Sequence, residues 1–232
     1  MRTPQRYDVL SLERLLVIDF ENTCGPGVTP GTSDIIEVGA YQWIRGEEID
    51  RARAISIKVR PTRSEVNKFC THLTGIYPHE LEGLPIFEQR APLIQALATD
   101  FGAQAWVSWG QDQNLLHKQC VGAGVENPFE GLPHFDIKRL LTSMVYEVSG
   151  GQRPKGSSDG VGLKTALKEL GLDFQGRQHS GSDDALNTAI LLQTLRNGAQ
   201  EKDLRAPVGQ ATRRPRIPLP RRAGSPEGCP KA

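Results

Sequence analysis

An apolar strand that ends in two carboxylates constrains this chain more than any other feature. Residues 14–21 read Arg-Leu-Leu-Val-Ile-Asp-Phe-Glu, which is typical of a buried strand whose last residues turn acidic. Side chains at positions i and i+2 of a strand lie on one face, so Asp19 and Glu21 point the same way. Two like charges held that close need a cation or a proton to offset their repulsion. The strand end either binds a cation or has simply reached solvent, and this segment alone leaves both interpretations open.

The segments around this strand predict a mixed α/β sheet. Residues 34–43 and 52–59 are rich in Ile, Val and aromatic side chains, and together with 14–21 they predict an antiparallel meander of three strands. Shorter extended segments, at 105–109 and 134–135, then alternate with helical patterns. Strands followed by alternating strands and helices indicate one sheet flanked by helices. The expected helices lie near 64–69, 92–102, 112–122, up to Tyr146, 163–170 and 181–195.

The two ends of the chain differ in composition from its middle. Residues 203–232 carry a net charge of +5 and residues 1–202 a net charge of −4. Pro, Arg, Gly and Ala dominate beyond Asn197, which predicts a disordered basic tail over 199–232. Its arginines either hold phosphates or are simply solvated. We expect one domain over 12–198, preceded by an extension at 1–11 and interrupted by a flexible Gly- and Ser-rich loop near 150–160.

Composition and segment patterns argue against several classes of protein. No apolar run approaches the roughly 18 residues of a membrane span, and residues 1–14 lack the apolar core of a secretory signal. The four cysteines form no C-x-x-C pair, which fits neither a disulfide framework nor a zinc site. We therefore expect a cytoplasmic protein with free thiols and no membrane partner.

Three further polar residues stand where a strand ends or a helix begins. Asp112 follows the 105–109 strand, where a helix cap explains an aspartate equally well. Asp184 falls in the first turn of the last helix, a position that the helix dipole favours. Its neighbour Asp183 points about 100° away around the helix, so only one of the two can face a given site. His179, on a glycine-flanked loop, becomes a candidate base because a neutral imidazole can accept a proton near pH 7.

Taken in order, these residues belong to a pattern that resembles the DEDDh 3′→5′ exonucleases. The pattern is most similar to the branch that contains the histone-mRNA 3′-end exonuclease and the enhanced-RNAi exoribonucleases, and it covers about residues 12–196. The resemblance implies a ribonuclease H-like fold with a mixed five-stranded sheet flanked by helices. Five segments carry it: Asp19 to Cys24, Ile35 to Ala40, Phe69 to Ile76, Asp112, and His179 to Asp184.

The resemblance also implies the residues of an active site. Two Mg²⁺ ions, for which Mn²⁺ can substitute, would be held by Asp19, Glu21, Asp112 and Asp184. His179 would act as the general base on the attacking water. The implied substrates are 3′ ends of single-stranded nucleic acid, with RNA favoured over DNA, and the implied products are nucleoside 5′-monophosphates.

For substrate contacts the resemblance points to two segments. The backbone around Asn22 and Thr23 would contact the terminal ribose. Residues 69–76 would line the pocket for the last base, with Leu73 as an apolar contact, although core packing of a short helix explains this segment equally well. Many relatives carry an aromatic residue where this chain has Gln111, which leaves the base preference open because aromatic rings are what bases stack on.

Two other functions fit the same pattern. One is a DNA-directed, proofreading-like exonuclease, since no residue of this chain reads a 2′-hydroxyl unambiguously. The other is a catalytically silent RNA-binding protein on the same fold. Silent relatives usually lose a carboxylate or the histidine, whereas this chain retains all five.

Overall fold

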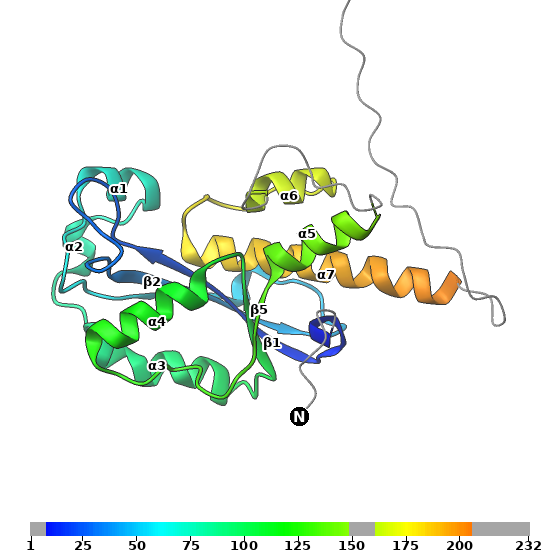
Figure 1. Ribbon diagram of the computed structural model, residues 1–232, viewed down its shortest axis with the longest axis horizontal. Helices are drawn as coiled ribbons and strands as arrows, with labels where there is room; N and C mark the ends of the chain where they lie inside the picture. Colours follow the sequence, from blue (N-terminus) through cyan, green and yellow to red (C-terminus); the bar gives the residue numbers. More distant parts are fainter. Residues whose placement is uncertain (1–7, 149–160, 206–232) are drawn as a thin grey trace, which may run out of the picture.

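A mixed five-stranded sheet forms the centre of the molecule. The computed structural model describes residues 8–148 and 161–205, and in these the strand order is β3-β2-β1-β4-β5 (Figure 1). Three antiparallel strands come first, and two strands parallel to β1 follow. The sheet confirms the expected meander and the parallel strands after it. The strands are β1 (Arg14–Asn22), β2 (Ile35–Ile44), β3 (Ala54–Lys58), β4 (Ala105–Ser108) and β5 (His134–Asp136).

Helices cover both faces of the sheet. The helices α3 (Phe87–Thr99) and α4 (Asp112–Ala123) pack on one face, and α5 (Ile137–Val148), α6 (Leu163–Glu169) and α7 (Gly181–Arg205) pack on the other (Figure 1). Two short helices, α1 (Lys68–Thr74) and α2 (Pro78–Leu81), follow β3 at one end of the sheet. Two 3₁₀ turns complete the described elements, at Asp8–Ser11 and Arg51–Arg53.

The alternation of side chains along β1 decides which face carries the two carboxylates. Leu15 and Val17 belong to the apolar cluster on the α7 side, whereas Leu16 and Ile18 belong to the cluster on the α3 and α4 side. Asp19 continues the row of Leu15 and Val17. The acidic end of β1 therefore faces the first turn of α7.

Several helix bounds differ from those expected from the sequence. The helix expected at 64–69 is α1 and begins at Lys68, because the Asn67 side chain accepts a hydrogen bond from the Cys70 N–H at 2.9 Å and caps it. The helix expected from Pro92 begins instead at Phe87, where the Gln89 side chain accepts from the Ile86 N–H at 3.2 Å. Helix α2 was not expected at all.

The folded region also extends beyond both ends of the domain predicted over 12–198. Val9, which falls in the expected N-terminal extension, is completely buried in the core on the α7 side. Helix α7 continues to Arg205, past the expected end near Leu195, because the residues beyond Asn197 include good helix formers. The sequence did not predict this continuation, because these residues lack apolar periodicity. The predicted loop at 150–160 and the tail beyond 205 lie outside the described residues. Cys24, Cys70 and Cys120 are free thiols.

Within the described ranges, no helix combines the length and the apolar character that a membrane crossing requires.

Candidate active site

Strands β1 and β2 place three carboxylates side by side. In the register of the two strands Asp19 pairs with Gly39, and Glu21 pairs with Glu37. Directly paired residues point to the same face, so Glu37 joins Asp19 and Glu21 on the α7 side. The register shifts after Glu21, at the transition to Asn22. Glu21 and Glu37 are both buried, at 7% and 4% exposure, which makes a strand end that has simply reached solvent the wrong interpretation.

A contact between two glycines places a fourth carboxylate, that of Asp184, over Asp19 and Glu21. Gly181, the first residue of α7, packs directly on the backbone of Gly39. A Cβ atom on Gly39 would overlap the backbone of Gly181. The Gly181 N–H donates to Glu37 Oε2 at 3.0 Å, which anchors the start of the helix on the sheet. One turn later Asp184 reaches Glu21 and His179, and the ligand atoms of these three residues all lie within 4.8 Å of one another.

Asp112 joins the cluster from α4. It is the first residue of α4, and the N-cap position before it is occupied by Gln111. Its Oδ1 atom accepts the N–H of Phe20 in β1 at 3.1 Å, so its carboxylate is held next to Asp19. The helix-cap interpretation of Asp112 is therefore wrong, and the structure brings the four predicted carboxylates together.

Burial raises the pKa of Asp19, Glu21, Asp112 and Asp184, and repulsion between these carboxylates adds to the rise at Asp19, Glu21 and Asp184. Burial, followed by the charges of Asp112 and Asp184, raises the pKa of Asp19 well above its ordinary value. Burial and neighbouring carboxylates raise the pKa of Glu21 to about 8 and that of Asp184 to about 7. Burial also raises the pKa of Asp112 to about 6, against its hydrogen bonds. Such a cluster needs protons or cations, and oxygen ligands suit hard divalent cations such as Mg²⁺ and Mn²⁺.

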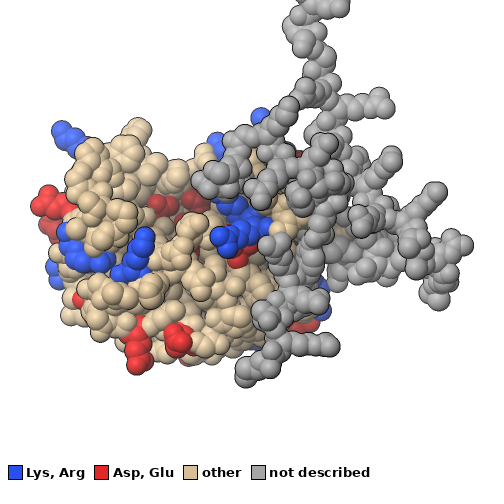
Figure 2. Space-filling model, viewed as in Figure 1, with Lys and Arg blue, Asp and Glu red and all other residues tan. Residues whose placement is uncertain are grey.

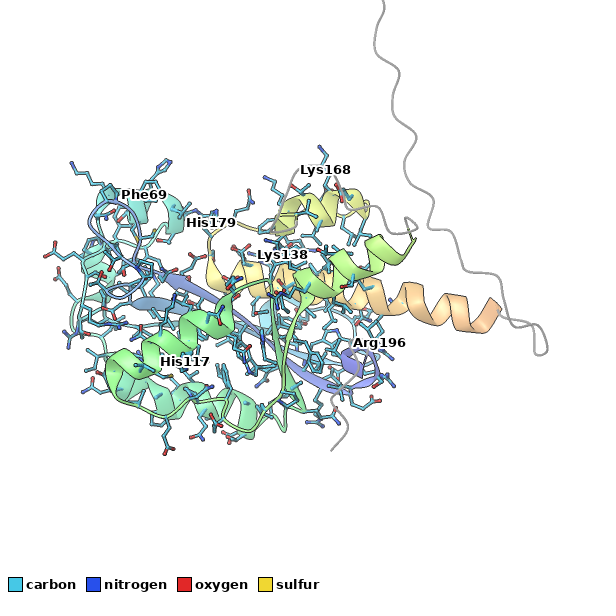
Figure 3. All side chains as sticks on the ribbon, in the orientation of Figure 1. Phe69, His117, Lys138, Lys168, His179 and Arg196 are labelled. Carbon is cyan, nitrogen blue, oxygen red and sulfur yellow. The ribbon has the colours of Figure 1, made fainter. Side chains whose placement is uncertain are left out.

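His179 is held on a strained loop above the cluster. Its backbone has φ 59°, in the left-handed region that few non-glycine residues adopt. Its N–H donates to Asp184 Oδ2 at 2.8 Å, and its imidazole is exposed. Figure 3 shows His179 on the loop that leads into α7, and Figure 2 shows acidic side chains recessed in the same part of this face. An exposed imidazole next to carboxylates can accept a proton from a molecule that approaches from solvent.

Only one of the two adjacent aspartates of α7 faces the cluster, as the helical geometry predicts. Asp183 turns away and forms an ion pair with Arg51, with a distance of 2.6 Å between the nitrogen and the oxygen. Its second oxygen accepts the N–H of Arg177 at 2.8 Å. Asp183 therefore anchors the loop, and Asp184 faces Glu21.

Glu37 is the site residue that the sequence analysis missed. Its Oε1 atom accepts the hydroxyl of Ser56 in β3 at 2.6 Å, while its Oε2 atom holds Gly181. A signal was present, because Glu37 is a lone charged residue in the apolar run of β2 and buried charges are paired. What the sequence could not show is that its partner lies 144 positions further along the chain.

The side chains of Asn22 and Thr23, predicted near the terminal ribose, are bonded within the protein. The Asn22 side-chain amide donates to Ser33 Oγ at 2.6 Å. Thr23 is completely buried, its hydroxyl lies 2.6 Å from Ser64 Oγ, and its N–H donates to the Asp34 carbonyl at 2.8 Å. These bonds fix the segment that follows β1, and the ribose contact stays a prediction.

The segment 69–76 is divided between the core and the surface. Ile76 is buried in a small apolar cluster with Cys70, as core packing predicts, whereas Phe69 is 53% exposed. Leu73 is half-buried on α1. Core packing therefore explains Ile76 but not Phe69, and the contact of Leu73 with a base stays a prediction.

Gln111 lies at the rim of a cavity of about 390 Å³ next to Asp112. Its side chain accepts from the Asn114 amide at 2.5 Å. Nearby Trp109 packs against the apolar core on the α7 side. Gln111 thus contributes a polar side chain to the lining of this cavity. The other lining residues are Gly110, Gln113, His134, Phe135, Asp136, Arg139 and Leu140.

The sheet topology, with a carboxylate cluster at the end of β1, is the ribonuclease H-like fold that the sequence motifs imply. The chain belongs to the exonuclease family, whose sequence model matches residues 16–192. A solved structure of the nuclease domain of 3′hExo, described as a DEDDh family member bound to rAMP, aligns with a TM-score of 0.63 at 24% identity, over 80% of this chain and 93% of that chain. The resemblance drawn from the sequence motifs is thereby confirmed.

Curated relatives carry exoribonuclease names. ERI1 exoribonuclease 2 of Xenopus laevis is 31% identical over 199 residues, which cover 77% of this chain and 28% of that protein. ERI1 exoribonuclease 3 of Homo sapiens is 30% identical over 205 residues, 83% of this chain and 55% of that protein. This chain therefore spans between about a quarter and a little over half of the length of these relatives.

Proposed function

We propose that this chain is a 3′→5′ exonuclease that hydrolyses phosphodiester bonds at the 3′ end of single-stranded nucleic acid and prefers RNA to DNA. The observation that carries the proposal is the meeting of Glu21, Asp184 and His179 within 4.8 Å, beside Asp19 and Asp112. A silent relative has no need to keep four carboxylates with raised pKa values so close together, because their repulsion costs stability.

The four carboxylates fit a pair of divalent cations. Asp19, Glu21, Asp112 and Asp184 offer oxygen ligands only, which suits Mg²⁺, with Mn²⁺ as a substitute. If two such ions were bound there, they would lower the pKa of an attacking water and stabilise the leaving oxygen. The raised pKa values support this assignment, because a cation offsets the repulsion that burial leaves unscreened.

His179 is the proposed general base. Its imidazole is exposed and lies next to Asp184 and Glu21, where it can take a proton from the attacking water. The oxygen of that water then forms a bond to the terminal phosphorus, the bond from phosphorus to the 3′ oxygen of the preceding nucleotide breaks, and that 3′ oxygen takes up a proton from solvent. The released product is a nucleoside 5′-monophosphate, and the shortened strand ends in a free 3′-hydroxyl.

The preference for RNA is supported by the names of the curated relatives and by the rAMP complex of the solved relative. Basic side chains next to the cavity at Gln111 also suit a phosphate backbone. Arg139 lines that cavity, and the side chain of Lys138, which is labelled in Figure 3, lies near Gly110, another residue of the lining. A DNA-directed enzyme remains the alternative that the substrate test separates. The cytoplasmic location stays a prediction.

The test compares matched 5′-labelled single strands of RNA and DNA with one sequence, in Mg²⁺, in Mn²⁺ and in EDTA. We expect a ladder that shortens from the 3′ end, faster on RNA, and that EDTA abolishes. Asp19→Ala protein purified in the same way controls for contaminating nucleases. Binding of the strands without shortening in either metal would identify a silent binding protein, and faster shortening of DNA would identify the DNA-directed alternative.

A further inference from the structure

We propose that Arg177 is a positioning residue that ties the loop of His179 to the C-terminus of α1 and so holds the imidazole at the carboxylate cluster. The inference rests on the proposed function, in particular on His179 as the general base. Arg177 acts through His179 and not on the substrate.

The Arg177 guanidinium holds the last turn of α1 from outside the helix. It donates to the carbonyl oxygens of Thr74 at 2.6 Å, Leu73 at 3.0 Å and His72 at 3.1 Å. The last carbonyls of a helix lack partners within it, and bonds from a charged donor to such groups are stronger than neutral ones. One side chain thus joins two segments that are more than 100 residues apart in sequence.

The shape of the helix end leaves room for this contact. Gly75 ends α1 with φ 74° in the left-handed region. A Cβ atom on Gly75 would overlap the Arg177 guanidinium, so the absence of a side chain at Gly75 leaves the space that the guanidinium occupies. Helix end and loop are complementary at this point.

The backbone of the same loop is anchored to α7 on both sides of Arg177. Before it, the Gln175 N–H donates to the Asn187 side chain at 2.9 Å. At the arginine itself, the N–H donates to Asp183 Oδ2 at 2.8 Å, and after it the His179 N–H donates to Asp184 Oδ2 at 2.8 Å. These bonds tie the loop to α7, and the Arg177 side chain ties it to α1.

The strain at His179 explains why the loop needs this second tie. A non-glycine residue at φ 59° stores free energy and persists only where its surroundings hold it. Releasing the tie to α1 lets the loop relax, which moves the imidazole away from Glu21 and Asp184. A displacement of about 1 Å in a reacting group can lower a rate about a hundredfold.

Two other roles for Arg177 would leave a different signature. Arg177 could simply stabilise α1, or its charge could act on Glu21, whose pKa it lowers. In either case its loss would slow the reaction whether or not His179 is present. A positioning role predicts that the loss matters only when the imidazole is there.

The experiment is a double-mutant cycle with the full chain. Single-turnover rates on a 5′-labelled single-stranded RNA in Mg²⁺ are measured for wild type, Arg177→Ala, His179→Ala and the double variant. We expect Arg177→Ala to slow wild type by about tenfold or more, and to slow His179→Ala by less than about twofold. Arg177→Lys should restore part of the rate in the presence of His179, because its ammonium can reach one of the three carbonyls.

Arg60→Ala is the matched control. The Arg60 side chain also donates to a carbonyl, that of Leu84 at 3.0 Å, and we expect its loss to leave the rate unchanged. Thermal unfolding of each variant checks that it folds, and if Arg177→Ala does not, the same cycle is run with Arg177→Lys.

The outcomes separate this inference from the function on which it rests. Equal slowing by Arg177→Ala with and without His179 would overturn the positioning role, while a slow His179→Ala enzyme would still support the general base. A wild-type rate for His179→Ala would instead remove the general base. An unchanged rate for Arg177→Ala, beside a slow His179→Ala, would overturn the positioning role alone.

Discussion

Gly39 of β2 and Gly181 of α7 meet backbone to backbone, and this contact places Asp184 over Asp19 and Glu21. A Cβ atom on Gly181 would stand 2.9 Å from the Gly39 nitrogen and 3.2 Å from the Asp19 carbonyl oxygen. Neither glycine needs a positive φ, so the requirement at both positions is space. The carboxylate cluster is assembled by this close approach of a helix to a sheet.

We predict that Gly39→Ala destabilises the fold by roughly 3 kcal/mol or more, because the new methyl group overlaps the backbone of Gly181 and no flexible side chain can yield. Gly162→Ala is the control, since a Cβ there meets nothing within 4 Å, and we expect a cost of about 1 kcal/mol or less. Urea unfolding in EDTA compares the two. Equal free energies of unfolding for Gly39→Ala and wild type would contradict the close packing of α7 on β2.

We predict that Asp19→Ala abolishes cleavage while the protein stays folded. Burial and the charges of Asp112, Asp184 and Glu21 raise the pKa of Asp19, which therefore lies among them, and its loss would remove one of the proposed oxygen ligands of the metal ions. The assay is 3′ shortening of labelled RNA, with thermal unfolding as the check on folding. Asp100→Ala, at the exposed end of α3, should cleave like wild type. Cleavage near the wild-type rate by Asp19→Ala would remove Asp19 from the metal site.

We predict that His179→Ala lowers turnover by roughly 10²–10⁴-fold and changes the affinity for Mg²⁺ much less, since a general base contributes on that scale. Turnover is measured on RNA, and affinity from the rise of the unfolding temperature with added Mg²⁺. The two readouts are needed because His179 lies close enough to Glu21 and Asp184 to bind any ion that these two carboxylates would hold. A loss of the Mg²⁺ response in His179→Ala would make His179 a ligand and not the base.

Local patterns in the sequence predicted the sheet and the shared face of Asp19 and Glu21, whereas the place of Asp112 and Asp184 in the cluster came from the resemblance to the DEDDh exonucleases. Period-two alternation along 14–21 placed Asp19 and Glu21 on one face, and the helical angle between Asp183 and Asp184 predicted that one of them turns away. These inferences need no knowledge of what lies across the sheet.

Features that depend on distant partners could not be predicted in this way. The bond from Gly181 to Glu37, the guanidinium of Arg177 on α1 and the tie of Asp112 to Phe20 all join residues far apart in sequence. The predictions of helix bounds were wrong for a related reason. The start of α1 depends on the Asn67 cap, and the end of α7 continues without an apolar stripe that would mark it.

We predict that Asp184→Asn stabilises the metal-free protein at pH 8, by roughly 2 kcal/mol, because it removes a repelling buried charge. Burial and neighbouring carboxylates raise the pKa of Asp184 from an ordinary 3.8 to about 7 in the folded state. Between these two values the folded state binds a proton that the unfolded state has lost, so the stability of the wild-type protein falls as the pH rises through this window. Above it the penalty is complete.

The measurement is urea unfolding in EDTA at several pH values from 5 to about 8, a range that covers most of this window. Wild type should lose stability with rising pH more steeply than Asp184→Asn. Asp100→Asn, at the exposed end of α3, is the control, and it should unfold like wild type. In Mg²⁺ the order of wild type and Asp184→Asn should reverse, since the cation binds the carboxylates and stabilises only a cluster that can hold it. A metal-free Asp184→Asn protein no more stable than wild type at pH 8 would show that repulsion at Asp184 is already relieved without a cation.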